Sequence, residues 1–187
     1  MKVNKKQVSS IIIAALMVFS VVGVVVVSYR DAVANEVVFG DFKFHQSAQG
    51  WTTTVAGRDK LFYYFPGDVA QSNVSNEAFL SLKLVKSVMV TYDDHTPAPD
   101  VFGLAQYHIE QTLSPQVYVI RGLVNSTTAL ASISCANATA ATPVVLLSLA
   151  NESSTVLDGN CVLVRALGPS DLMMQVDALM FKMLGIT

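Results

Sequence analysis

The chain has 187 residues, of which 52% are hydrophobic and 14% are charged, and its formal net charge is −2. Four of the twelve basic residues lie at or before position 30, so the rest of the chain carries eight basic against fourteen acidic residues, about −6. That balance argues against nucleic-acid binding and against extended contact with anionic lipid, because both need clusters of Lys and Arg.

Residues 8–28 are predicted to form a transmembrane signal anchor. The segment 8–27 reads VSSIIIAALMVFSVVGVVVV, and as a helix an uncharged run of this length crosses the roughly 30 Å core of a bilayer. Lys2, Lys5 and Lys6 precede it, which places residues 1–7 in the cytoplasm by the positive-inside rule. Residues 29–187 are then an extracytoplasmic domain on a single-pass cell-membrane protein.

A cleaved secretory signal is the alternative reading of the same segment. Ala32-Val33-Ala34 has the small-x-small form that signal peptidase accepts, with cleavage after Ala34. The apolar run is longer than the roughly 7–15 residues of a signal-peptide core, which favours an uncleaved anchor. Both readings place residues 35–187 outside the cytoplasm.

Sequons and cysteines support export. Asn-x-Ser/Thr sequons without an intervening proline occur at four positions, which makes the outer part a candidate glycoprotein: Asn73, Asn125, Asn137 and Asn151. The alternative is a set of surface loops rich in Ser and Thr. The two cysteines, Cys135 and Cys161, are predicted to form a disulfide, since an even number of Cys in an exported domain is typical of one.

Residues 36–66 are predicted to form a three-stranded antiparallel β-meander. Alternating side chains in VVFGDFKFHQ give the first strand, with Phe42 and Phe44 on one face. Polar turns separate it from a strand at 51–55 and from an aromatic-rich strand at 61–65. Pro66 and Gly67 end the third strand.

A βαβ unit follows. Ser75 is predicted to cap a helix that runs to about residue 85. Residues 87–92 are typical of a buried strand, 100–113 of a second helix and 116–120 of another buried strand. A strand, a helix and a strand within this length are expected to pair the two strands in parallel.

The C-terminal third contains a polar surface excursion (122–142) with one short strand near 131–135. The most apolar strand is expected at 143–147, in the centre of the sheet. After a polar loop, residues 161–166 are predicted to return antiparallel as a hairpin. A final helix begins at Gly168-Pro169-Ser170-Asp171 and carries an apolar stripe up to Gly185.

The predicted fold class is therefore α+β: an N-terminal transmembrane helix, then an antiparallel β-meander joined to a βαβ-containing mixed sheet with helices.

The strongest candidate for chemistry is Asp93-Asp94-His95, which follows the predicted strand 87–92. Ligands gather at the carboxyl ends of strands in α/β sheets, and carboxylate and imidazole donors suit Zn²⁺, Mn²⁺ or Ca²⁺. Asp100, His108 and Glu110 follow, although the last two lie two residues apart on a helix and so do not share a face. The alternative is a solvated loop before a helix whose acidic first turn suits its dipole.

No established catalytic spacing is present. The sequence has no HExxH, EF-hand loop, GxSxG, CxxC or glycine-rich phosphate loop, so no catalytic residue is predicted, and a divalent metal at residues 93–95 is the one cofactor considered. The aromatic cluster of Trp51 and residues 62–65 is expected to have one face in the core. Its other face is either a ligand or partner surface or a packing surface.

Four stretches together resemble a family of single-pass surface proteins of archaea whose function is unknown: MKVNKKQVSSIIIAALMVFSVVG, GWTTTVAGRDKLFYYFPGDV, CANAT and GNCVLVRA. The resemblance covers most of the chain in layout and implies an archaeal cell surface, but it supplies no activity and no functional residues. Pilin-like subunits also begin with basic residues and a long apolar helix. They carry a Glu near the start of that helix, whereas here no acid precedes Asp31.

The expected function is a membrane-anchored extracytoplasmic binding or assembly module without catalytic activity. Its expected partners are the lipid bilayer, through residues 8–28, and other envelope proteins. One alternative is a metal-dependent hydrolase that uses the loop 93–95. Another is a subunit of a larger membrane complex, since small residues in the apolar run allow close approach of another helix: Ser9, Ser10, Ala14, Ala15 and Gly23.

Overall fold

The computed structural model describes residues 16–18, 36–126 and 130–186. The predicted anchor 8–28 lies outside these residues except for 16–18, which are helical, and the cleavage motif 32–34 lies outside them entirely. Among the described residues no helix combines the length and the apolar character that a membrane crossing requires. The chain divides into units 1–37 and 38–187, and the elements below belong to the second apart from the first residues of β1.

The predicted meander is an antiparallel sheet of four strands, β1 (Glu36–Phe39), β2 (Phe42–Ser47), β3 (Gly50–Val55) and β4 (Arg58–Phe62), in that order. The prediction of three strands was wrong because the first one is broken at Gly40. That residue has φ 57° and forms a tight turn with Asp41, and a positive φ is a conformation that glycine adopts without strain.

The second sheet has six strands in the order β7 (Ala131–Ser132), β6 (Tyr118–Leu123), β5 (Ser87–Tyr92), β8 (Val144–Leu149), β10 (Cys161–Ala166) and β9 (Ser154–Asp158). The predicted βαβ unit is confirmed, since β5 and β6 pair in parallel on either side of the connecting helix α3 (Pro99–Leu113). Strand β8 occupies the central position predicted for it, between β5 and β10.

The predicted hairpin between β8 and β10 was wrong. These two strands are parallel, with Val144 opposite Cys161. Residues predicted as a loop form β9, which pairs antiparallel with the far edge of β10. The short apolar stretch in β9 is flanked by polar residues, so its local sequence pattern does not indicate a strand. Tertiary contacts stabilise it: Thr155 is fully buried and exchanges backbone hydrogen bonds with Asn73 and Ser75.

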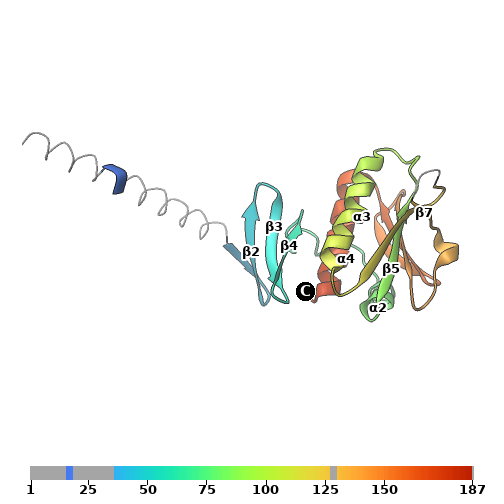
Figure 1. The fold of residues 1–187 in the computed structure, drawn as a ribbon, viewed down its shortest axis with the longest axis horizontal. Helices are drawn as coiled ribbons and strands as arrows, with labels where there is room; N and C mark the ends of the chain where they lie inside the picture. Colours follow the sequence, from blue (N-terminus) through green and yellow to red (C-terminus); the bar gives the residue numbers. More distant parts are fainter. Residues whose placement is uncertain (1–15, 19–35, 127–129, 187) are drawn as a thin grey trace, which may run out of the picture. The chain divides into compact units, whose positions relative to one another are not determined.

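Helices cover one face of the six-stranded sheet. They are α2 (Asn76–Lys83), α3 and α4 (Pro169–Leu184), and in Figure 1 α3 and α4 lie between the two sheets. The predicted cap of α2 is confirmed, because Oγ of Ser75 accepts a hydrogen bond of 3.1 Å from the backbone N–H of Ala78. Phe181 of α4 contacts the meander through the rings of Phe44 and Phe62, at centroid distances of 6.1 and 4.3 Å.

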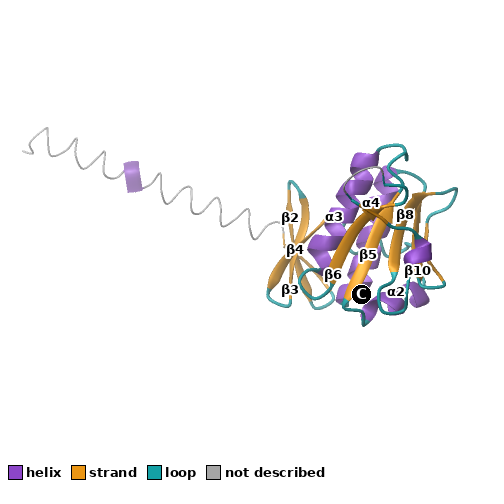
Figure 2. Ribbon diagram, turned by 45° about the vertical axis from the view of Figure 1, so that its right-hand side comes forward, coloured by secondary structure: helices purple, strands orange, loops and turns teal. Residues whose placement is uncertain are grey.

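The polar excursion lies on the opposite face of the sheet, where Figure 2 shows the strands in front of the helices. Its 3-10 helix η1 (Cys135–Asn137) and Ile133 contact Val144 and Cys161 in a second small apolar cluster. The predicted disulfide is present: Cys135 and Cys161 are bonded with an S–S distance of 2.00 Å. The bond ties the excursion to the first residue of β10, as expected.

Candidate functional site

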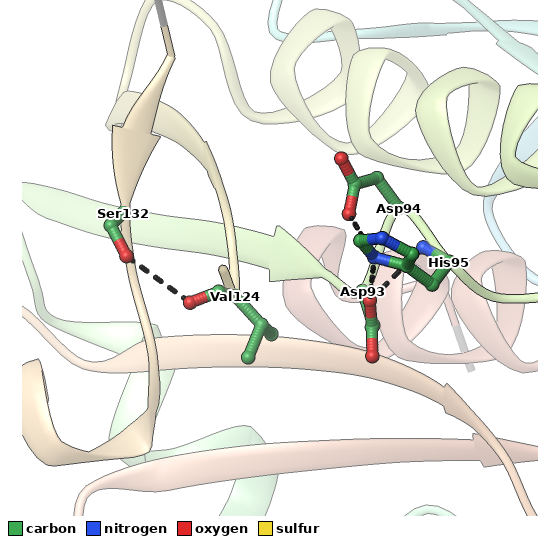
Figure 3. A network of polar contacts seen from close by, with 5 residues as sticks. All are labelled: Asp93, Asp94, His95, Val124 and Ser132. Carbon is green, nitrogen blue, oxygen red and sulfur yellow. Dashed lines mark hydrogen bonds and ion pairs between the residues drawn. The ribbon is translucent and has the colours of Figure 1, made fainter. Parts of the chain in front are cut away.

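The loop Asp93-Asp94-His95 lies at the carboxyl end of β5, where the strand order reverses. From β5 the chain runs outward through β6 to β7 and then returns to the other side of β5 as β8. In α/β sheets such a switch point is the usual location of a ligand site. Near this loop, Oγ of Ser132 on β7 donates a hydrogen bond of 3.1 Å to the carbonyl oxygen of Val124, which follows β6 (Figure 3).

The three predicted side chains come together. The ring of His95 lies between the two carboxylates (Figure 3), with Nδ1 at 2.8 Å from Oδ1 of Asp94 and 3.3 Å from Oδ1 of Asp93. One ligand atom from each residue lies within 4.8 Å of the others, which is compatible with a shared metal ion. Oδ1 of Asp93 also accepts the backbone N–H of His95 at 3.0 Å, so an ordinary Asx turn fixes the loop.

Asp94 is the most enclosed member of the cluster. Its side chain is 25% exposed, against 53% for Asp93 and 76% for His95. Oδ1 of Asp94 is buried, and its close polar contact among the described residues is Nδ1 of His95 at 2.8 Å, without hydrogen-bond geometry. Burial, and then the nearby charge of Asp94, raises the pKa of Tyr92 at the end of β5. The cluster thus contains one partly enclosed carboxylate, one exposed carboxylate and one exposed imidazole.

The other predicted neighbours do not join this cluster. Asp100 is exposed in the first turn of α3, where an acid favours the helix dipole. Glu110 pairs with Arg121 of β6, Oε2 to Nε at 3.1 Å. His108 points into the core instead, so the expectation that His108 and Glu110 occupy different faces of the helix is confirmed.

His108 forms a second polar centre with a partner that the sequence did not predict. Its Nε2 lies 2.6 Å from Oδ1 of Asp177 on α4, and the two side chains are 5% and 0% exposed. Oδ2 of Asp177 accepts the backbone N–H groups of Tyr63 and Tyr64, both at 2.8 Å. Burial, and next the charge of Asp177, raises the pKa of both tyrosines. One feature of the sequence could have indicated this centre. Asp177 is an acid between Val176 and Ala178, which are buried in the final helix, and a buried acid needs a polar partner.

A cavity of about 270 Å³ adjoins this centre, with Tyr63, Tyr107 and His108 in its wall. Lys60 also lines it, but its Nζ donates to the carbonyl oxygens of Gln111 and Ser114 at 2.9 and 2.7 Å. These carbonyls end α3, so the ammonium caps that helix. Burial, and then the charge of Arg58, lowers the pKa of Lys60. Lys60, His108 and Asp177 each have a structural partner, which favours a role in holding α3, α4 and β4 together.

A second cavity, of about 260 Å³, lies between α4 and the segment 66–74. Its lining is mainly apolar, with Val69, Val74 and Phe181 each at most 7% exposed. Lys182 is in its wall, and its ammonium donates a hydrogen bond of 2.6 Å to the carbonyl oxygen of Val74, another wall residue. An apolar cavity with few polar groups is typical of a small-molecule site.

The aromatic cluster is resolved as packing. Strand β4 ends at the fully buried Phe62, and the ring of Phe65 contacts Trp51 at a centroid distance of 4.8 Å. Tyr64 turns toward α4, where its hydroxyl donates to the carbonyl oxygen of Ser170 at 3.0 Å. Both faces of the segment 62–65 therefore have protein partners.

The four sequon asparagines are exposed: Asn73, Asn125, Asn137 and Asn151. Exposure makes each side chain reachable, which glycosylation requires. Glycosylation itself stays a prediction.

Comparison with protein families, curated proteins and solved structures finds no family model, no curated sequence and no structure that matches this chain.

Proposed function

We propose that the chain is a membrane-anchored binding module whose folded domain lies outside the cytoplasm and has no catalytic activity. The disulfide Cys135–Cys161 is the observation that supports this most directly, because disulfides persist in oxidising compartments and are rare in the cytosol. The bond closes a 26-residue separation within the domain, so it is part of the fold. The long apolar run in residues 8–28 supplies the anchor.

Two further features agree with an exported domain. The sequon asparagines are exposed where the structure describes them, and the domain after Arg30 is acidic, which suits a surface that does not lie flat on anionic lipid. The resemblance to single-pass surface proteins of archaea is consistent with the same location. A binding role is supported by the apolar cavity beside Lys182.

Alkaline carbonate extraction of membranes that contain the full chain tests the anchor. The chain is expected in the pellet, and a Leu16→Arg, Val18→Arg variant is expected in the supernatant, because each arginine at the centre of a span costs about 2.5–3.5 kcal/mol of insertion free energy. Leu84→Arg is the matched control, since Leu84 is 86% exposed in the folded domain. A wild-type chain that is fully extracted contradicts the proposal.

A second candidate function is binding of a divalent metal at the 93–95 loop, as in a metal-dependent hydrolase. The specific observation that favours it is the buried Oδ1 of Asp94, whose close polar contact among the described residues is Nδ1 of His95 at 2.8 Å, without hydrogen-bond geometry. Elemental analysis of the purified full chain tests it, with Zn²⁺, Mn²⁺ and Ca²⁺ measured separately. One equivalent of metal that Asp94→Asn removes and Asp158→Asn keeps would support a metal site. Equal metal content in all three proteins would exclude it.

A further inference from the structure

We propose that the cavity between α4 and the segment 66–74 binds the hydrocarbon chain of a medium-chain carboxylate, with the ammonium of Lys182 facing the carboxylate group. The inference rests on the proposed binding function and names a ligand class for it.

The cavity has the size and lining for one short hydrocarbon chain. Phe39, Pro66 and Ala178 complete a wall that already contains Val69 and Phe181. At roughly 30 Å³ for each water-sized group, its volume of about 260 Å³ accommodates about nine carbon atoms. Burial of each methylene group in such a lining is favourable, because it removes apolar surface from water.

The C-terminal cap of α4 forms part of this wall. Gly185 has φ 75° and its N–H donates to the carbonyl oxygen of Lys182, while the N–H of Ile186 donates to that of Phe181 at 2.9 Å. This Schellman arrangement turns the chain back on the helix. Ile186 is thereby buried, at 2% exposure, and lines the cavity instead of reaching into solvent.

Lys182 gives the cavity its preference for an anion. Its side chain is half-buried and held in the wall by the hydrogen bond to the carbonyl oxygen of Val74. A carbonyl oxygen does not neutralise the charge, and an ammonium has three donors, of which this bond uses one. A carboxylate can accept a further, charge-assisted hydrogen bond. The ammonium of an amine of the same chain length cannot accept this bond, and an alcohol can accept it but carries no opposite charge.

The test is binding of ¹³C-carboxyl-labelled decanoate to the full chain in lipid nanodiscs, followed by NMR below the micelle concentration. Ala70→Trp is the informative variant, because Ala70 is exposed and lines the cavity, so the indole fills it without disturbing the core. Ala136→Trp adds the same bulk at an exposed position of η1. Some decanoate partitions into the nanodisc lipid. Subtracting the binding measured with Ala70→Trp from the binding measured with Ala136→Trp removes that contribution.

Saturable binding is expected for the wild type and for Ala136→Trp and is expected to be lost in Ala70→Trp. Affinity should rise about fourfold for each methylene from hexanoate to decanoate and then stay level at tetradecanoate. Lys182→Gln should weaken decanoate binding about tenfold or more, and Lys182→Arg should restore most of it. Decylamine should bind more weakly than decanoate by a similar factor.

Three results would overturn the inference: equal binding by Ala70→Trp and Ala136→Trp, equal affinity for decanoate and decylamine, or a change in the decanoate signal that is the same in nanodiscs without the protein. Failure of the proposed anchor can be distinguished from failure of this inference, because carbonate extraction measures membrane anchoring without any ligand. A chain that stays in membranes but does not bind decanoate keeps the proposed function and loses this inference.

Discussion

Nε2 of His108 lies 2.6 Å from Oδ1 of Asp177, and this buried contact joins α3 to α4. The second carboxylate oxygen accepts the backbone N–H groups of Tyr63 and Tyr64, which follow β4. One acid thus connects both long helices to the four-stranded sheet. Its three partners offset the cost of burying a charge.

Asp177→Ala is expected to lower the free energy of unfolding by about 3–5 kcal/mol, because the substitution leaves His108 and two backbone donors buried without an acceptor. Urea unfolding followed by circular dichroism measures the change. Asp158→Ala, at the exposed end of β9, is the control and should change stability by no more than about 0.5 kcal/mol. A loss below about 1 kcal/mol for Asp177→Ala would show that the contact does not hold the helices together.

Removal of the disulfide is expected to destabilise the domain. In the chain-entropy model a loop of 26 residues is worth about 3–4 kcal/mol. The double variant Cys135→Ser, Cys161→Ser should therefore unfold at lower urea than the oxidised wild type. The reduced wild type should match the variant, and a reduced protein as stable as the oxidised one is the result that speaks against this prediction.

Gly50→Ala is expected to be strongly destabilising. Gly50 begins β3 with φ 134°, and a Cβ atom there would lie 2.2 Å from the carbonyl oxygen of Phe62 on β4. The backbone of β4 must shift, so we expect a loss of more than about 2 kcal/mol. Gly168→Ala is the matched control, since a Cβ at Gly168 meets no atom within 4 Å. Equal stability of the two variants would refute the predicted clash.

Stability is expected to fall at alkaline pH. Burial raises the pKa of Tyr63, Tyr64 and Tyr92 above 10.0, so the folded state holds these protons more tightly than the unfolded state. Their contribution is complete below about pH 10 and is lost as the pH rises through the folded pKa values. The lowered pKa of Lys60 acts in the opposite sense, because its contribution is present above 10.5 and lost as the pH falls through the folded pKa.

Tyr63→Phe isolates the contribution of one tyrosine, since the substitution keeps the aromatic ring beside His108 and removes only the titratable hydroxyl. Urea unfolding at about pH 9, 10 and 11 should show a smaller alkaline loss in Tyr63→Phe than in the wild type. Tyr118→Phe is the control, because Tyr118 is 71% exposed. Identical pH profiles for Tyr63→Phe and the wild type would rule out the expected role of Tyr63.

Elements with strong local signals could be predicted from the sequence. The helix capped by Ser75, the parallel pair β5 and β6, the Cys135–Cys161 bond and the apolar stripe of α4 all follow from spacing, capping and composition. What could not be predicted depends on long-range contacts. Strand β9 needs the pairing of Thr155 with the segment before α2, and no local pattern shows that pairing.

The same division applies to the sites. The 93–95 cluster is local, since consecutive residues form it, and the structure brings it together as expected. The His108–Asp177 contact joins residues 69 positions apart, so the sequence offered an acid in an apolar stripe but not its partner. The cavity beside Lys182 is formed by Phe39, the segment 66–74 and the end of α4, which become neighbours only in the folded chain.

Protease treatment of intact cells that produce the full chain with a C-terminal epitope tests the central claim most directly, with a cytoplasmic reporter as the control for cell integrity. The epitope is expected to be lost while the reporter survives, because residues 29–187 face the outside. An epitope that is protected until the cells are lysed would contradict the proposed topology, and with it the proposed location of the disulfide, the sequons and the binding cavity outside the cytoplasm.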